Sequence, residues 1–190
     1  MPELTGFYLV GGTSLGLQLG HRNSIDIDLF SQHEFEDQFI IDCITKKYVF
    51  LEKFRRKNTI IGFIHDIKVD FICHPYPLVK EPISEEGITY LSKEDIAAMK
   101  LNAIAGSGQR LKDFIDVYFL LESLSVNDML ECYSIKYPNS NPMIALKAIS
   151  YFEDIDPDID PPKMKTPLSL KKIKKRITEA VLHQYKTFKE

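Results

Sequence analysis

The chain has 190 residues, of which 44% are hydrophobic and 27% charged, a balance that is typical of one globular domain and excludes a largely disordered or fibrous protein. Its 24 basic and 27 acidic side chains give a net charge of −3 at pH 7, which excludes an overall basic coat for nucleic acid. No apolar run is long enough to span a membrane, no secretory signal is visible and the three cysteines form no CxxC pair, so we expect a cytoplasmic protein with no membrane contact.

Up to about residue 73 the sequence predicts strands mixed with short helices. Residues 7–10 are a short apolar, β-prone run that ends in Gly-Gly-Thr-Ser at residues 11–14, where Thr13 or Ser14 can cap a short helix. Residues 25–30 alternate apolar and acidic side chains, which predicts a strand with both aspartates on one face. The remaining elements predicted here are a helix over residues 34–47 and strands over residues 48–56, 59–65 and 67–73.

The chain changes character near residues 80–90, where prolines and a glycine interrupt regular structure. We therefore predict a strand-rich core over residues 1–85 and a helical bundle over residues 86–190 packed on it, which together make an α/β (α+β) fold. The predicted helices cover residues 93–105, 110–123, 127–136, 142–151 and 169–188, and an acidic, proline-rich loop covers residues 153–162.

The strongest chemical signal is the pair of aspartates on the strand at residues 25–30. Asp26 and Asp28 project from the same strand face, and two like charges there need a cation or a hydrogen-bonding partner. Mg²⁺ prefers such carboxylates together with water and phosphate oxygens. Asp70, in the middle of an apolar strand, is a candidate third carboxylate. The alternatives are a solvated strand face for the pair and an ion pair with a nearby Lys or Arg for Asp70.

The glycine-rich turn before the first helix adds a second signal. Gly11 and Gly12 would let backbone N–H groups approach an anion at a helix N-terminus. The alternative is a tight turn that needs glycine for a positive φ. Because the turn lies one short helix before the acidic strand, phosphate donors and metal-binding carboxylates are expected to lie close together.

These segments carry a resemblance to a known family. Gly-Gly-Thr at residues 11–13, the Asp26-x-Asp28 strand and the later Asp70 strand resemble the nucleotidyltransferase superfamily related to DNA polymerase β. Longer strings resemble the AbiEii/AbiGii toxin family of nucleotidyltransferases; they are residues 7–15, 21–30, 95–101, 110–121 and 150–154. The resemblance implies a nucleotidyltransferase fold with a mixed sheet in the first half and helices in the second.

The resemblance also implies roles for individual residues. Asp26, Asp28 and Asp70 would bind Mg²⁺, with two ions when a nucleotide is bound. The residues implied to hold the nucleoside triphosphate are Gly11, Gly12, Thr13, Ser14, Ser24, Lys100 and Asp113. Lys100 and Asp116 are implied to be catalytic together with the three metal-binding aspartates. Asp113 and Asp116 form the family's later acidic motif, and they share a helix face at i and i+3. Lys112 is expected to form a surface salt bridge with Asp116 at i,i+4.

The implied function is Mg²⁺-dependent transfer of a nucleoside monophosphate from an NTP to an acceptor hydroxyl, with release of pyrophosphate. The implied acceptor is tRNA or another RNA, and the implied partner is a cognate antitoxin protein. Family members usually begin with a helix before the first strand, so this chain is expected to start late. One alternative is therefore a catalytically inactive nucleotide-binding or partner-binding module on the same fold.

A second alternative is a DxD phosphatase, whose first aspartate becomes a phosphorylated nucleophile. Such enzymes have a long apolar strand before that aspartate, whereas residues 22–24 here are Arg-Asn-Ser. The basic run at residues 171–176 is a further candidate RNA contact, but we slightly favour a solvated helix face that pairs with the acidic loop.

Overall fold

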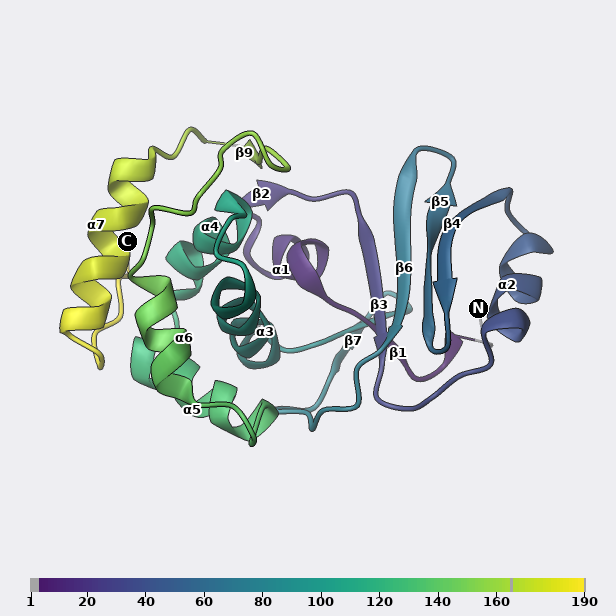
Figure 1. The fold of residues 1–190 in the computed structure, drawn as a ribbon, viewed down its shortest axis with the longest axis horizontal. Coiled ribbons are helices and arrows are strands. Elements are labelled where there is room, and N and C mark those ends of the chain that lie inside the picture. The colour runs from purple at the N-terminus through teal and green to yellow at the C-terminus, as the bar shows by residue number, and fades with distance from the viewer. Residues whose placement is uncertain (1–3, 165, 190) are drawn as a thin grey trace.

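A mixed seven-stranded sheet forms the centre of the molecule, as shown by a computed structural model that describes residues 4–164 and 166–189 (Figure 1). The strands lie in the order β4-β5-β6-β3-β1-β8-β7. Their bounds are β1 (Phe7–Leu9), β3 (Ile27–Ser31), β4 (Phe50–Arg56), β5 (Thr59–Ile64), β6 (Ile67–Cys73), β7 (Ile83–Glu85) and β8 (Ile88–Tyr90). A separate short pair joins β2 (Arg22–Asn23) to β9 (Lys163–Met164) in antiparallel fashion.

The helices divide unequally between the two sides of the sheet. Their bounds are α1 (Gly11–Leu19), α2 (Asp37–Thr45), α3 (Lys93–Gly106), α4 (Leu111–Leu120), α5 (Val126–Lys136), α6 (Pro142–Ile149) and α7 (Leu170–Leu182). In Figure 1, α1 and α3 to α7 lie on the left of strands β3 to β6, whereas α2 lies on the right. Among the described residues, no helix is long and apolar enough to cross a membrane.

The two faces of the sheet have separate hydrophobic cores. Val69 and Phe71 on β6 point toward α2, where they are buried with Ile40, Ile44 and Ile60. The larger core lies among the helices and includes Val10 and Leu15 at the start and in the middle of α1. Because strand side chains alternate, the neighbours of Val69 and Phe71 on β6 face the helical side of the sheet.

Most predicted elements are confirmed, with shifts of a few residues at their ends. β6 covers the predicted residues 67–73, and the turns at Asn58 and His65 have positive φ values of 62° and 54°. Ser92 caps α3 by accepting a hydrogen bond of 3.0 Å from the backbone N–H of Asp95. The predicted cap of α1 at Thr13 or Ser14 is wrong, because the helix already begins at Gly11 with Val10 as its N-cap and no side-chain cap bond.

The segment between the two predicted regions contains a hairpin that the sequence did not indicate. Strands β7 and β8 pair there, and the backbone N–H of Leu91 donates to the oxygen of Leu9 on β1 at 3.1 Å. The hairpin therefore extends the main sheet across the predicted boundary at residues 85 and 86. The division of the chain into a core and a helical bundle stays a prediction.

Candidate functional site

The pairing of β3 with β6 brings two predicted carboxylates together. These strands are parallel, and Asp28 lies opposite Asp70 in their register. Side chains that lie opposite each other in a sheet share a face, so both carboxylates point to the helical side. Asp26 precedes β3 by one residue and lines the same cavity as the other two. The three carboxylates predicted from the sequence therefore all line one cavity.

Burial gives these carboxylates unusual properties. Burial and the neighbouring charge of Asp70 raise the pKa of Asp28. One oxygen of Asp70 forms an ion pair with Lys68 at 2.5 Å. This pairing agrees with the alternative that the sequence left open for Asp70, an ion pair with a nearby Lys or Arg. Within the described structure, the other oxygen of Asp70, Oδ1, is buried and has no hydrogen-bond partner. An unbonded carboxylate oxygen in such a place is costly unless a cation or donor binds it.

The N-terminus of α1 approaches the carboxylates closely. The backbone N–H of Val10, the N-cap residue of α1, donates to the main-chain carbonyl oxygen of Asp28 at 2.9 Å. Gly11 has a φ of 68°, and a Cβ there would lie 2.5 Å from a carboxylate oxygen of Asp28. Both the positive φ and the close approach therefore require glycine. A Cβ at Gly12 would lie 2.0 Å from the guanidinium of Arg22, so this second glycine makes room for a cation.

A cavity of about 260 Å³ opens at this point and gathers most of the predicted residues. Those that line it are Gly11, Gly12, Ser24, Asp26, Asp28, Asp70, Lys100 and Asp113. Thr13, Ser14 and Asp116 do not line it. Thr13 donates instead to the backbone oxygen of Asp26, and the hydroxyl of Ser14 lies 3.4 Å from the oxygen of Leu91. A larger hollow of about 730 Å³ beside β1 has no charged group among its described lining residues.

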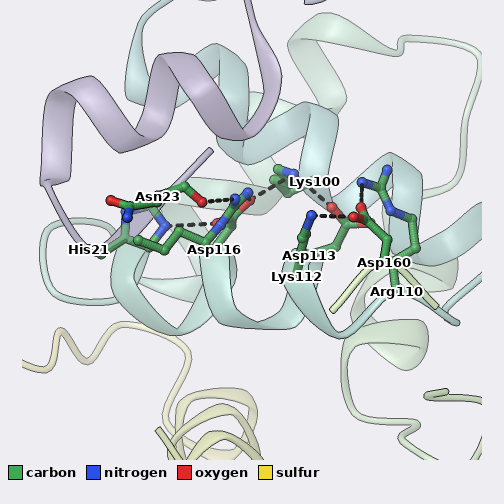
Figure 2. Close-up of polar contacts among 9 residues, drawn as sticks. His21, Asn23, Lys100, Arg110, Lys112, Asp113, Asp116 and Asp160 are labelled. Atoms are coloured by element: carbon green, nitrogen blue, oxygen red, sulfur yellow. Dashed lines mark hydrogen bonds and ion pairs between the residues drawn. The ribbon is translucent and has the colours of Figure 1, made fainter. Parts of the chain in front are cut away.

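Asp116 is the centre of a buried ionic network behind the cavity (Figure 2). Its carboxylate accepts from Arg22 at 2.7 and 2.9 Å, from His21 at 2.8 Å and from Lys100 at 2.8 Å. Lys100 also bonds Asp113 at 2.7 Å. Asp116 is fully buried, and burial acts to raise its pKa, but Lys100, Arg22 and His21 together lower it well below the usual value. The network fixes Arg22 and Lys100 at the cavity wall.

A second group of ions lies at the start of α4. Asp160, in the acidic loop, bonds both Arg110, at 2.8 Å, and Lys112 (Figure 2). The predicted salt bridge between Lys112 and Asp116 is therefore wrong. Lys112 pairs with Asp160 instead, and Asp116 pairs with Arg22 and Lys100. Arg110 and Lys112 both line the cavity, and sequence reasoning assigned neither of them to the site.

The end of the cavity beyond the carboxylates is apolar and aromatic. Phe30 and Ile72 follow Asp28 and Asp70 at the next same-face positions of β3 and β6, and they too are opposite in register. His74 and Tyr137 complete this end, with the Tyr137 hydroxyl 3.2 Å from Nε2 of His74. Burial and the nearby Lys136 lower the pKa of His74 to about 4, so its ring is neutral at pH 7. In the sequence, the signal that could have predicted this apolar end is the alternation on β3 and β6, which places Phe30 and Ile72 on the same face as the aspartates.

The donor set suits Mg²⁺ bound together with a phosphate ligand. Among the described residues, no three His, Cys, Asp or Glu side chains are arranged to enclose a metal ion by themselves. Mg²⁺, however, usually takes only one or two carboxylates and completes its shell with water and substrate phosphate. Asp28 and Asp70 lie side by side, and the buried oxygen of Asp70 that has no hydrogen-bond partner could be a ligand of such an ion.

The basic run at residues 171–176 lies on α7, away from the main sheet (Figure 1). Lys174 lies 3.9 Å from Glu153 of the acidic loop, and Arg176 bonds Glu122 at 3.0 Å. Pairing within the chain thus accounts for part of this run.

Comparisons with known proteins agree with this architecture. Residues 2–184 match the family described as nucleotidyl transferase AbiEii toxin, type IV TA system. An uncharacterised protein of Aquifex aeolicus is 35% identical over 165 residues, which cover 82% of this chain and 80% of that protein. A putative nucleotidyltransferase from Helicobacter pylori has a similar structure, with 16% identity, a TM-score of 0.58 and coverage of 95% and 86% of the two chains. The nucleotidyltransferase toxin MenT4 from Mycobacterium tuberculosis gives 13% identity, a TM-score of 0.61 and coverage of 92% and 74%.

Proposed function

The chain belongs to the AbiEii nucleotidyltransferase toxin family of type IV toxin–antitoxin systems, and from this premise we propose that it is a Mg²⁺-dependent enzyme that transfers an NMP from an NTP to an acceptor hydroxyl. One observation carries the proposal: Asp28 and Asp70 lie side by side in a cavity that also contains the N-terminus of α1. An anion-binding helix end beside paired carboxylates is the arrangement that a metal-bound triphosphate requires.

The shape of the cavity indicates how an NTP would lie in it. The triphosphate would occupy the end formed by Gly11, Gly12, Arg22 and Lys100, where N–H groups and cations gather. Asp28 and Asp70, with Asp26 beside them, would hold one ion or two at the centre. The base would then lie against the apolar end at Phe30 and Ile72.

The proposed reaction forms a bond between the acceptor oxygen and the α-phosphorus. The bond from that phosphorus to the bridging oxygen of the β-phosphate breaks, pyrophosphate leaves and the hydroxyl proton passes to water. Mg²⁺ would supply charge neutralisation of the phosphates. The chain's own contribution is positioning: the network around Asp116 fixes Arg22 and Lys100, and the register of β3 and β6 fixes the carboxylates.

The proposed acceptor is tRNA or another RNA, and the proposed partner is a cognate antitoxin protein. The family description supports the antitoxin partner, because it includes the toxin–antitoxin system. The RNA acceptor is proposed from the resemblance of the sequence to the family.

Transfer of label from each α-labelled NTP to total tRNA, with Mg²⁺ present, tests the proposal. We expect Asp28→Asn to lower transfer by at least about a hundredfold, because it removes one carboxylate charge from the metal site without adding bulk. Asp66→Asn, an exposed aspartate on the β5–β6 turn, is the matched control and should transfer at the wild-type rate. A wild-type rate in Asp28→Asn would reject the proposed metal site.

The second candidate is a nucleotide-binding module without catalysis. NTP binding by the wild-type chain, measured by calorimetry, combined with no transfer to RNA or to protein would favour it.

A further inference from the structure

The sheet face that carries the two carboxylates continues beyond the cavity onto β5 and β4. Asp70 on β6 lies opposite Ile61 on β5, and Ile61 lies opposite Phe54 on β4. Residues opposite each other in antiparallel strands share a face. Asp28, Asp70, Ile61 and Phe54 therefore form one row that crosses four adjacent strands on the helical side of the sheet.

Two parallel rows flank this one. In the first row, Lys68 lies opposite Phe63, which lies opposite Leu51. In the second row, Ile72 lies opposite Thr59, which lies opposite Arg56. The contacts on the other face confirm this assignment. Phe50 packs with the core beside α2, and Arg55 donates to Gln38 on α2 at 2.7 Å.

This part of the face is open to solvent. Tyr8 and Phe30, on the same face over β1 and β3, pack against the helical core. On β4, by contrast, Leu51 is 57% exposed and Phe54 is 48% exposed. Among the described residues, Leu51, Phe54, Ile61 and Phe63 contribute to neither hydrophobic core. An aromatic and aliphatic surface that no helix covers therefore borders directly on the paired carboxylates.

We propose that this surface binds the single-stranded end of a polynucleotide acceptor and leads its terminal hydroxyl to Asp28 and Asp70. We call it the acceptor strip; it consists of Leu51, Phe54, Ile61 and Phe63, with Lys68 and Arg56 at its two ends. The proposal rests on the proposed function, because it identifies the acceptor of the same reaction.

The charge of the surrounding segment favours a polyanion. Residues 46–68 contain seven basic and two acidic side chains, although the whole chain has a net charge of −3. Of these basic side chains, Arg56 and Lys68 lie in the rows on the face of the strip, whereas Arg55 lies on the opposite face and Lys57 pairs with Glu34. Of the two cations that flank the strip, Lys68 already binds a carboxylate oxygen of Asp70 at 2.5 Å. Lysines and arginines beside an exposed aromatic ring are the combination that binds unpaired bases and their phosphates.

The position of the strip also suits an acceptor end. Phe54 lies two strands from Asp70, and two strand spacings amount to about 10 Å. This distance corresponds to roughly three stacked nucleotides at about 3.4 Å each. A base stacked on Phe54 would thus place the terminal hydroxyl of the same strand near the carboxylates.

RNA binding without catalysis tests the proposal directly. The probes are a fluorescein-labelled single-stranded RNA and the same RNA annealed to its complement, with EDTA present so that no transfer takes place. We expect the wild-type chain to bind the single strand more tightly, and Phe54→Ala to raise its dissociation constant at least about fivefold. Leu51→Ala should add to this loss. Ile144→Ala is the matched control, because Ile144 is 57% exposed on α6, and should change the constant less than about twofold.

Both altered side chains are exposed, so we expect the variants to fold. Thermal unfolding checks that they do. Equal affinity of wild type and the double variant for the single strand would overturn the proposal, as would label transfer to a protein hydroxyl with no binding of either RNA.

The test separates this proposal from the proposed function. Strip-dependent RNA binding without transfer from any NTP would support the strip and reject the proposed function. Transfer to RNA at the same efficiency in wild type and double variant would reject the strip and support the proposed function.

Discussion

Asp28 and Asp116 belong to neighbouring parts of one site, but their surroundings shift their pKa values in opposite directions. Burial and Asp70 raise the pKa of Asp28, whose charge no described side chain neutralises by direct contact. Asp116 is also buried, yet Lys100, Arg22 and His21 lower its pKa. One carboxylate therefore has its cations within the protein, whereas the other has no described cation in direct contact, which is consistent with the proposed metal site. This difference suggests a positioning role for Asp116, which does not line the cavity.

Replacing Asp116 should destabilise the fold strongly. Asp116→Asn removes the charge that two buried cations share, and an uncompensated buried charge costs about 3–5 kcal/mol in the free energy of unfolding. Urea unfolding followed by circular dichroism measures this loss. Asp160→Asn is the control, because that carboxylate is 38% exposed and should contribute less than about 1 kcal/mol. An Asp116→Asn variant as stable as wild type would contradict the role assigned to the network.

His74 should make stability depend on pH in mildly acidic solution. Its pKa falls from 6.5 to about 4 in the folded chain, because of burial and Lys136. The unfolded chain therefore binds more protons between these values, and the free energy of unfolding falls as the pH is lowered from about 6.5 to 4. His74→Gln should make this dependence shallower, whereas His33→Gln, at an exposed position, should leave it unchanged. Unfolding temperatures measured across this pH range provide the check, and identical slopes in wild type and His74→Gln would refute the assignment.

At the scale of elements, the start of α1 joins the backbone to the carboxylates. Gly11 adopts a left-handed φ of 68° and lies directly against Asp28. The positive φ supports the tight-turn interpretation of the sequence at this residue, and anion binding there stays a prediction. A side chain at Gly11 would have to displace the carboxylate or the helix.

Gly11→Ala should affect the site more than the fold. The strained φ costs about 1 kcal/mol in stability, and the new Cβ displaces the Asp28 carboxylate, so Mg²⁺-dependent transfer should fall at least about tenfold. Gly106→Ala is the matched control, because its Cβ would meet nothing within 4 Å at the end of α3. Unfolding temperature and transfer rate are measured for both. Full activity in Gly11→Ala would show that the close approach to Asp28 is unimportant.

The sequence predicted the elements with strong local signals. Strands β5 and β6 were found because turn residues such as Asn58 and His65 separate two apolar runs. The hairpin of β7 and β8 was missed because its residues are mostly exposed and directly follow Pro82, so no hydrophobic period marks them. β2 and β9 have only two residues each, which is too short for any pattern.

The candidate site was predictable in part for the same reason. Asp26 and Asp28 share a local motif, and the Gly-Gly turn lies near them in the sequence. Arg110, Lys112 and Tyr137 enter the cavity from the helices, and only the tertiary packing determines that they do. Asp160 likewise reaches Lys112 from a loop far along the chain.

At the scale of the whole molecule, the helices and the sheet share their interior. Val10 and Leu15 belong to the helical core, although they come from the strand-rich region. The backbone of β8, in the second region, is hydrogen-bonded to β1. Neither region therefore buries its apolar surface alone, and we expect the chain to unfold as one unit.

Substitutions in either core should lower the stability of both regions equally. Ile60→Ala affects the core beside α2 and Ile115→Ala the helical core, and each should cost about 2–5 kcal/mol. Hydrogen exchange followed peptide by peptide measures the effect: each variant should speed exchange of the slowest amides in the sheet and the helices by a similar factor. Faster exchange in one region alone would show that the predicted regions are independent domains.

The carboxylate pair exists only where β6 has been inserted beside β3, since Asp28 and Asp70 are far apart in the sequence. A ribosome that has released β3 but not β6 therefore carries no complete carboxylate pair. Under the proposed function, a newly made molecule becomes active only after long-range folding. If cells are selected for surviving expression of this protein, the mutations that inactivate it should be scattered through the buried strands and helices rather than concentrated at the aspartates.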